Sequence, residues 1–127
     1  YMDGGLADSI PIEYALEKGN DKIVVVLTRN PGYRKKRALK ATEQLYKRAY
    51  KKYPNLVRAI MTRNAVYNRQ MKLIEKLEEE GKIFVIRPLI PTVSRMEKDY
   101  DKLQHFYMHG NRLMKKEYQG LLEYLNE

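Results

Sequence analysis

The sequence predicts an α/β fold that is mostly helical, with two buried strands that pair in parallel. Two apolar runs, "KIVVVLT" at 22–28 and "KIFVIRP" at 82–88, are typical of strands buried on both faces. Segments with helical periodicity follow each run, and strands that alternate with helices favour parallel pairing.

Two helices are expected in the first half of the chain. A short one covers 12–18, begins after Pro11, is capped by Asp8 and ends at Gly19. The second is a basic amphipathic helix over 35–53. At 100° per residue its apolar face carries Leu39, Tyr46, Ala49, Tyr50 and Tyr53.

Two longer helices are expected in the second half. One spans 56–80 and ends at a glycine, and the last is capped by Asp99 or Asp101 and reaches about Leu125. Gly110 falls on the apolar stripe of the last helix, where we expect another element to approach closely. That stripe consists of Leu103, Phe106, Tyr107, Leu113, Met114, Leu121 and Leu125.

The composition narrows the classes of protein and of site. Of the 127 residues 43% are hydrophobic, enough for a core, and there is no cysteine for a disulfide, a thiolate metal site or a thiol nucleophile. The run 23–27 is too short to span a bilayer, so we expect a cytoplasmic protein, peripheral at the membrane if it meets one. His105 and His109 share a helix face without a third ligand, so we predict no metal and no cofactor.

The positive charge is concentrated in one segment. The net charge is +9, and residues 34–52 hold nine Lys or Arg and one acid. Three interpretations stay open for this basic helix: a solvated face, a docking surface for anionic lipid headgroups, and a nucleic-acid surface. No nucleic-acid motif is present, so nucleic acid is not the expected partner. The residues predicted to contact a lipid surface together are Lys36, Lys40, Lys47 and Lys51.

The first residues suggest that 1–127 is the C-terminal portion of a single larger domain. Asp3-Gly4-Gly5 is a turn signal, and such a turn is useful where a strand precedes it. Two strands also make a poor sheet by themselves. We therefore expect the remainder of the domain upstream of residue 1, and self-association of the chain through its uncovered sheet edge.

The stretch "DGGLADSIPIEYAL" resembles the aspartate motif of patatin-like phospholipases. The turn Asp3-Gly4-Gly5 matches the motif, and Ile10-Pro11 matches the pair that starts the following helix. "VVVLTRNPGYRKK", "RNAVYN" and "IFVIRP" look like the C-terminal half of the bacterial branch of that family. The resemblance implies the C-terminal part of a three-layer α/β hydrolase domain.

The activity implied by the resemblance is hydrolysis of lipid acyl esters by a Ser-Asp dyad. Asp3 would be the general base, with Gly4 and Gly5 shaping its turn. The G-x-S-x-G elbow and the Gly-rich oxyanion loop are absent from this sequence, and the family carries both upstream of the aspartate. The chain alone is therefore expected to be inactive.

Two other interpretations compete with this one. Asp3 is alternatively a turn-forming residue with no catalytic role. The whole chain is alternatively a non-catalytic basic α/β module that binds an anionic membrane or nucleic acid.

Overall fold

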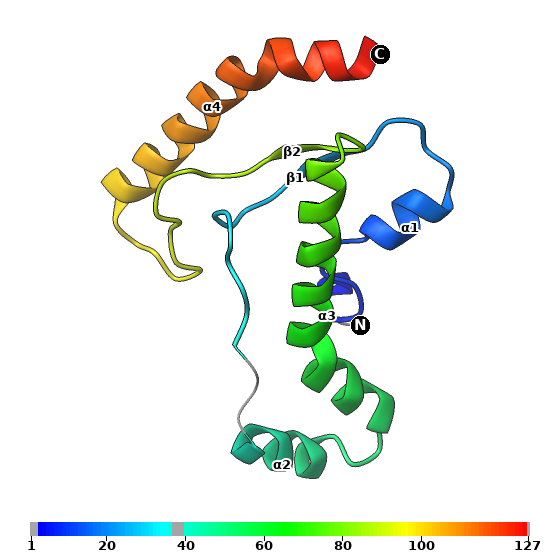
Figure 1. Cartoon of the computed structure of the whole chain (residues 1–127). Helices are drawn as coiled ribbons and strands as arrows, with labels where there is room; N and C mark the ends of the chain where they lie inside the picture. Colours follow the sequence, from blue (N-terminus) through cyan, green and yellow to red (C-terminus); the bar gives the residue numbers. More distant parts are fainter. Residues whose placement is uncertain (1–2, 37–39, 127) are drawn as a thin grey trace. The chain divides into compact units, whose positions relative to one another are not determined.

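The computed structural model describes residues 3–36 and 40–126. The chain is mostly helical and has two parallel strands, as the sequence predicts (Figure 1). In the described residues no helix combines the length and the apolar character needed to cross a bilayer. The elements in chain order are η1 (Gly4–Leu6), α1 (Ile12–Glu17), β1 (Val24–Val26), α2 (Lys40–Ala49), α3 (Pro54–Glu79), β2 (Phe84–Ile86) and α4 (Tyr100–Asn126).

The chain divides into two compact units. Unit 1 consists of Tyr1–Asn20 and Arg34–Lys76, and unit 2 of Asp21–Tyr33 and Leu77–Glu127. Unit 1 therefore contains η1, α1, α2 and most of α3, whereas unit 2 contains the sheet and α4.

The core of unit 1 forms along one face of α3. Met71 and Ile74 are fully buried, and Tyr67 is nearly so. These residues recur at spacings of three and four, so they lie on one side of the helix. Ile12 of α1 is buried in the same unit.

Two asparagines on α3 hold the segment that leads to α2. Asn68 accepts the backbone N–H of Lys35 through Oδ1 at 2.8 Å and donates from Nδ2 to the Lys35 carbonyl at 2.9 Å. Asn64, one turn earlier, donates to the Lys36 carbonyl at 2.7 Å. The predicted helix start at Lys35 is therefore wrong, because these backbone groups bond to α3 instead of a helical ladder. The structure begins α2 at Lys40.

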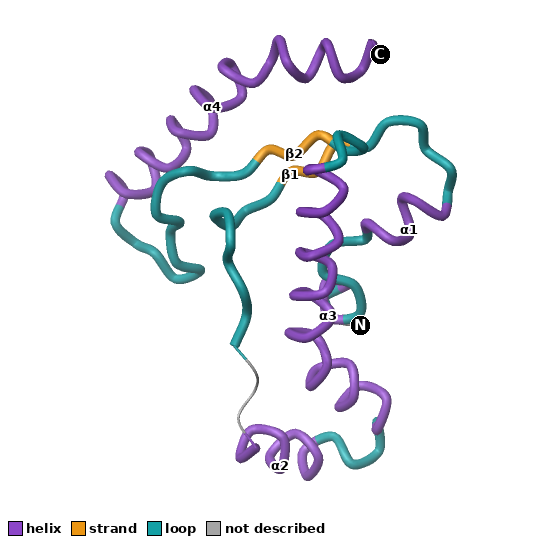
Figure 2. The backbone as a smooth tube through the Cα atoms, viewed as in Figure 1, coloured by secondary structure: helices purple, strands orange, loops and turns teal. Residues whose placement is uncertain are grey.

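Strands β1 and β2 form the sheet of unit 2 (Figure 2). They pair in parallel, with Val24 beside Phe84 and Val26 beside Ile86. The expectation that β1 is buried on both faces is wrong, because Val24 and Val26 are exposed. The physical reason is that the sheet has two strands in the described part of the chain and that α4 packs on β2.

Helix α4 begins where the sequence predicts, but it contacts the sheet at a different glycine from the predicted one. Asp99 caps it, since Oδ1 accepts the backbone N–H groups of Asp101 at 3.1 Å and Lys102 at 3.2 Å. The expected close approach at Gly110 is wrong, because a Cβ there would meet no atom within 4 Å. The helix instead contacts the sheet at Gly120, where a Cβ would lie 3.7 Å from the ring of Phe84.

Candidate functional site

The opening turn is held by its own aspartate. Asp3 caps η1, and its Oδ1 accepts the backbone N–H of Gly5 at 3.0 Å. Neither Gly4 nor Gly5 has a left-handed φ, so the turn itself does not require glycine at these positions. The structure thus gives Asp3 a local structural role, and its role as a general base stays a prediction.

A serine and an arginine lie beside this turn. Ser9 donates its hydroxyl proton to the Gly5 carbonyl at 2.9 Å, and Arg63 Nε donates to Ser9 Oγ at 3.5 Å. The Ser9 proton is therefore committed to a backbone acceptor. The Asp3 carboxylate thus bonds to the backbone N–H of Gly5, and the Ser9 hydroxyl bonds to a carbonyl and not to Asp3.

Asp8 contacts α3 instead of capping α1. Pro11 occupies the N-cap of α1 without a side-chain bond, so the predicted cap is wrong. The Asp8 carboxylate accepts Gln70 Nε2 at 2.5 Å. Gln70 is 1% exposed, so its amide N–H group needs a hydrogen-bond acceptor within the protein, and Asp8 supplies it. Its Oε1 is buried with no hydrogen-bond partner among the described residues.

The described histidines do not suggest a metal centre. His109 Nε2 accepts the backbone N–H of Leu89 at 3.1 Å, which gives this side chain a structural partner. Within residues 3–36 and 40–126 no three or more metal-ligating side chains gather in one place.

The basic patch lies on the end of α2, the turn that follows it and the start of α3. We define it as the exposed cations Lys47, Arg48, Lys51, Lys52 and Arg58. Only part of the predicted lysine face belongs to it. Lys36 lies outside α2 because its carbonyl is bound by Asn64, and the side chain of Lys40 lies outside the described residues.

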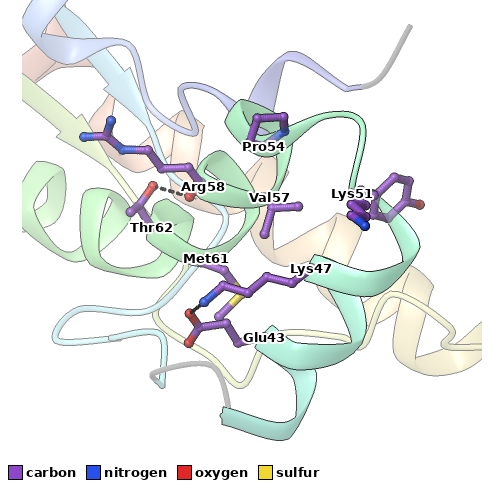
Figure 3. A pocket seen from close by; sticks show the side chains of 9 residues that line it. Glu43, Lys47, Lys51, Pro54, Val57, Arg58, Met61 and Thr62 are labelled. Carbon is purple, nitrogen blue, oxygen red and sulfur yellow. Dashed lines mark hydrogen bonds and ion pairs between the residues drawn. The ribbon is translucent and has the colours of Figure 1, made fainter.

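A hollow of about 370 Å³ opens between α2 and the first turns of α3 (Figure 3). Its apolar lining comes from Tyr50, Pro54, Val57 and Met61, and its charged lining from Glu43, Lys47, Lys51 and Arg58. Glu43 and Lys47 form an ion pair at 2.7 Å. The cations Lys51 and Arg58 leave a net positive charge at the hollow after this pair is formed, which suits an anionic group.

The predicted apolar stripe of the basic helix is covered only in part, and Leu45, which lies outside that stripe, is exposed. Leu45 is 65% exposed, Tyr53 is 63% exposed, and Ala49 is exposed as well. Tyr46 and Tyr50 of the same stripe are half-buried, and Tyr50 lines the hollow together with Lys47. Leu45 lies roughly opposite Lys47 around the helix axis, so it points away from the hollow that Lys47 lines. The predicted stripe residue Leu39 lies outside the described residues.

The fold and the patch define a small, mostly helical α/β chain with a basic amphipathic helix. A family model described as Domain of unknown function (DUF6363) matches residues 53–126, and the chain belongs to this family. No curated protein and no solved structure matches it.

This finding corrects the patatin-like interpretation of the sequence. The matching family is a different one, so the resemblance is wrong as an identification. It rested on a short turn, an Ile-Pro pair and apolar strands, and in the structure these features have local explanations. Asp3 caps η1, and two residues of "RNAVYN", Asn64 and Asn68, bind the backbone of 35–36. Sequence reasoning missed this pair, although two asparagines one turn apart are a visible signal.

Proposed function

We propose that this chain docks on anionic membrane surfaces through α2 and the basic patch. The observation that carries the proposal is that α2 places exposed apolar side chains next to exposed cations. No residue between Ala41 and Ala49 is buried. A helix with this distribution lies in the interface of a bilayer, with its apolar side among the lipids and its cations at the headgroups.

The positions around the helix axis fit this orientation. Leu45 and Ala49 lie one turn apart on the same side. On α2 itself Arg48 flanks that side and Lys47 lies farther round, while Lys51 and Lys52 follow in the turn between α2 and α3. Cations near an apolar strip extend their charged ends to the headgroups while their stems cover apolar surface.

The patch has enough charge to change partitioning. A basic residue near an anionic surface contributes about 1 kcal/mol at physiological salt, so four of them change binding by roughly two to three decades. The attraction should weaken with salt, because the Debye length falls to about 3 Å at 1 M. Glu43 reduces the effect because it already pairs with Lys47.

The exposed apolar residues favour a membrane over nucleic acid as the partner. The apolar side chain of Leu45 cannot bind phosphates, because those contacts are made by cations and hydrogen-bond donors. Tyr46 and Tyr50 already stack on each other with ring centroids 6.1 Å apart, so their rings serve each other rather than a base.

The experiment is vesicle co-sedimentation of the full chain with and without anionic lipid. One variant changes Lys47, Arg48, Lys51 and Lys52 to Gln, which keeps helix propensity and removes charge. A matched control changes four exposed lysines elsewhere, Lys72, Lys98, Lys115 and Lys116, to Gln. We expect the patch variant to lose binding to anionic vesicles by about two decades and the control variant to retain most of it.

A third variant separates the membrane from nucleic acid. Leu45→Gln keeps every charge and should weaken vesicle binding several-fold because an exposed apolar contact is lost. Binding of a labelled single-stranded RNA should be weak and unaffected by this change. Tight RNA binding that depends on the patch, with vesicle binding unaffected by Leu45→Gln, would assign the surface to nucleic acid instead.

A further inference from the structure

The outer edge of β1 presents main-chain groups that the sheet does not use. On its inner edge Ile23 accepts the N–H of Phe84 at 3.0 Å, and Leu27 donates to Ile86 at 2.8 Å. Backbone groups alternate along a strand, so Val24 and Val26 direct their N–H and C=O groups to the opposite edge. Within the described part of the chain no third strand joins them there.

The side chains at this edge are exposed as well. Val24 is 38% exposed and Val26 is 70% exposed. The strand itself contains only valine, without the charge, proline or bulge that natural proteins place on edges to prevent pairing. An edge of this kind is a template for another strand.

We propose that β1 pairs antiparallel with β1 of a second copy of this chain. The pairing is centred on Val25 and forms a four-stranded sheet in the order β2, β1, β1 and β2. In this register Val24 of one copy faces Val26 of the other, and each N–H of this pair meets a carbonyl across the interface. A two-fold axis through the centre satisfies both copies equally and closes the assembly as a dimer.

The same register is complementary in its side chains and charges. The exposed Val24 and Val26 become direct cross-strand neighbours on one face, and each covers the other. Beyond the strand, this register brings the exposed Asp21 of one copy toward Arg29 of the other copy, whose guanidinium keeps its charge while it donates to Thr92 at 3.1 Å. Because of the two-fold axis, opposite charges lie near each other at both ends of the interface. The edge of β1 is therefore complementary to a second copy of itself, and the strand of another protein would match it only by chance. This observation selects a second copy as the occupant.

Disulfide trapping tests the register, because the chain contains no cysteine. Val25 faces itself across the axis at a non-hydrogen-bonded position, where Cα atoms lie about 4.5 Å apart, within the roughly 4.4–6.8 Å range of disulfides. Val25→Cys should therefore cross-link to itself under mild oxidation. Val85→Cys is the matched control, since Val85 is similarly half-buried but its backbone faces the outer edge of β2.

A proline at the edge tests the main-chain bonds. Val26→Pro removes a donor that faces away from β2, so the β1–β2 ladder keeps its bonds while the edge is blocked. In the Val25→Cys background it should slow cross-linking at least tenfold, with an unchanged circular dichroism spectrum. If the proline changes that spectrum, Asp21→Lys in the Val25→Cys background is used instead. It places two like charges at each end of the interface, so it should also slow cross-linking.

Sedimentation of the unmodified chain completes the experiment. We expect a monomer–dimer equilibrium between about 1 and 200 μM. A chain that is monomeric throughout this range overturns the proposal. Equal cross-linking of Val25→Cys and Val85→Cys overturns it too, because the association then does not use the edge of β1. Dimerisation that survives the Lys47, Arg48, Lys51 and Lys52 to Gln variant supports it and separates it from the membrane proposal.

Discussion

The phenol oxygen of Tyr124 lies 3.0 Å from the backbone nitrogen of Ile23, 101 residues earlier in the chain. The same oxygen lies 3.0 Å from the carbonyl oxygen of Lys82, to which it can donate its proton. Tyr124 is buried and its ring packs against Phe84 with centroids 5.8 Å apart. One hydroxyl of α4 thus joins the segments that lead into both strands, which explains how so small a sheet is held.

Tyr124→Phe should destabilise unit 2. The ring and its packing are retained, but the N–H of Ile23 and the carbonyl of Lys82 lose their partner in a partly buried place. We expect a loss of about 1–3 kcal/mol in the free energy of unfolding, measured by urea denaturation. Tyr107→Phe is the control, because Tyr107 is exposed on the same helix and should change stability little. Equal effects of the two changes would show that the Tyr124 hydroxyl is dispensable.

Because Asp8 accepts a hydrogen bond from Gln70, replacing Asp8 should reduce stability more than replacing an exposed residue usually does. Asp8→Ala should destabilise by about 1–3 kcal/mol, because it leaves the buried amide of Gln70 without an acceptor. Gln70→Met should be near neutral or stabilising, since it removes a buried oxygen that has no partner among the described residues.

A double-mutant cycle tests this coupling. In the Gln70→Met background Asp8→Ala should cost much less than in the native chain, because no buried donor is then left unpaired. The measurement is the free energy of unfolding of all four proteins in urea. A cost of Asp8→Ala that is the same in both backgrounds would contradict the coupling.

Two glycines should respond in opposite directions to alanine. Gly110 lies within α4 and a Cβ there meets nothing within 4 Å, so Gly110→Ala should stabilise by about 0.5–1 kcal/mol through helix propensity. Gly81 follows α3 with φ of 66°, a conformation that strains any residue with a Cβ. Gly81→Ala should therefore destabilise by about 1 kcal/mol. The midpoints of thermal unfolding of the two variants are the readout, and a loss of stability in Gly110→Ala would indicate an unobserved contact at that helix face.

The elements of this fold were predictable where the pattern is local. The β-branched runs predicted both strands and their parallel pairing. The sequence offered Asp99 or Asp101 as the cap of α4, and the structure has Asp99 in that position. The start of α2 was not predictable, because it is decided by Asn68 bonding to Lys35, 33 residues away. Periodicity contains no information about side chains that remove backbone groups from a helix.

Burial and the candidate site also divide into features that the local sequence predicts and features that depend on long-range contacts. The charge run predicted where the basic patch is, since charge is read directly from the residues. It did not predict that Lys36 lies off the helix, because that depends on Asn64 binding the Lys36 carbonyl. It did not predict that Leu45 and Tyr53 are exposed either, because burial depends on long-range packing. The exposure of Val26 depends on how many strands the sheet has, which no single strand reveals.

The N-terminus of α4 should depend on pH through Asp99. Hydrogen bonds from the backbone N–H of Lys102, helped by the charge of Lys102 and the N–H of Asp101, lower the pKa of Asp99 below its ordinary value of 3.8. A carboxyl whose pKa is lower in the folded state stabilises that state above pH 3.8, and this contribution is lost as the pH falls through the lower, folded pKa. The first turn of α4 should therefore open more readily in acid, while the same turn is protected at neutral pH.

Asp99→Asn provides the matched comparison for this dependence. Asparagine also caps a helix through its side-chain oxygen but does not titrate. Amide hydrogen exchange at Lys102, followed from pH 5 down to about pH 2, should lose protection in the native chain after correction for intrinsic rates. The Asn variant should show no loss that depends on Asp99. A carboxyl carbon titration should place the pKa of Asp99 below 3.8, and a value at or above it would show that the backbone N–H groups do not hold the charged form.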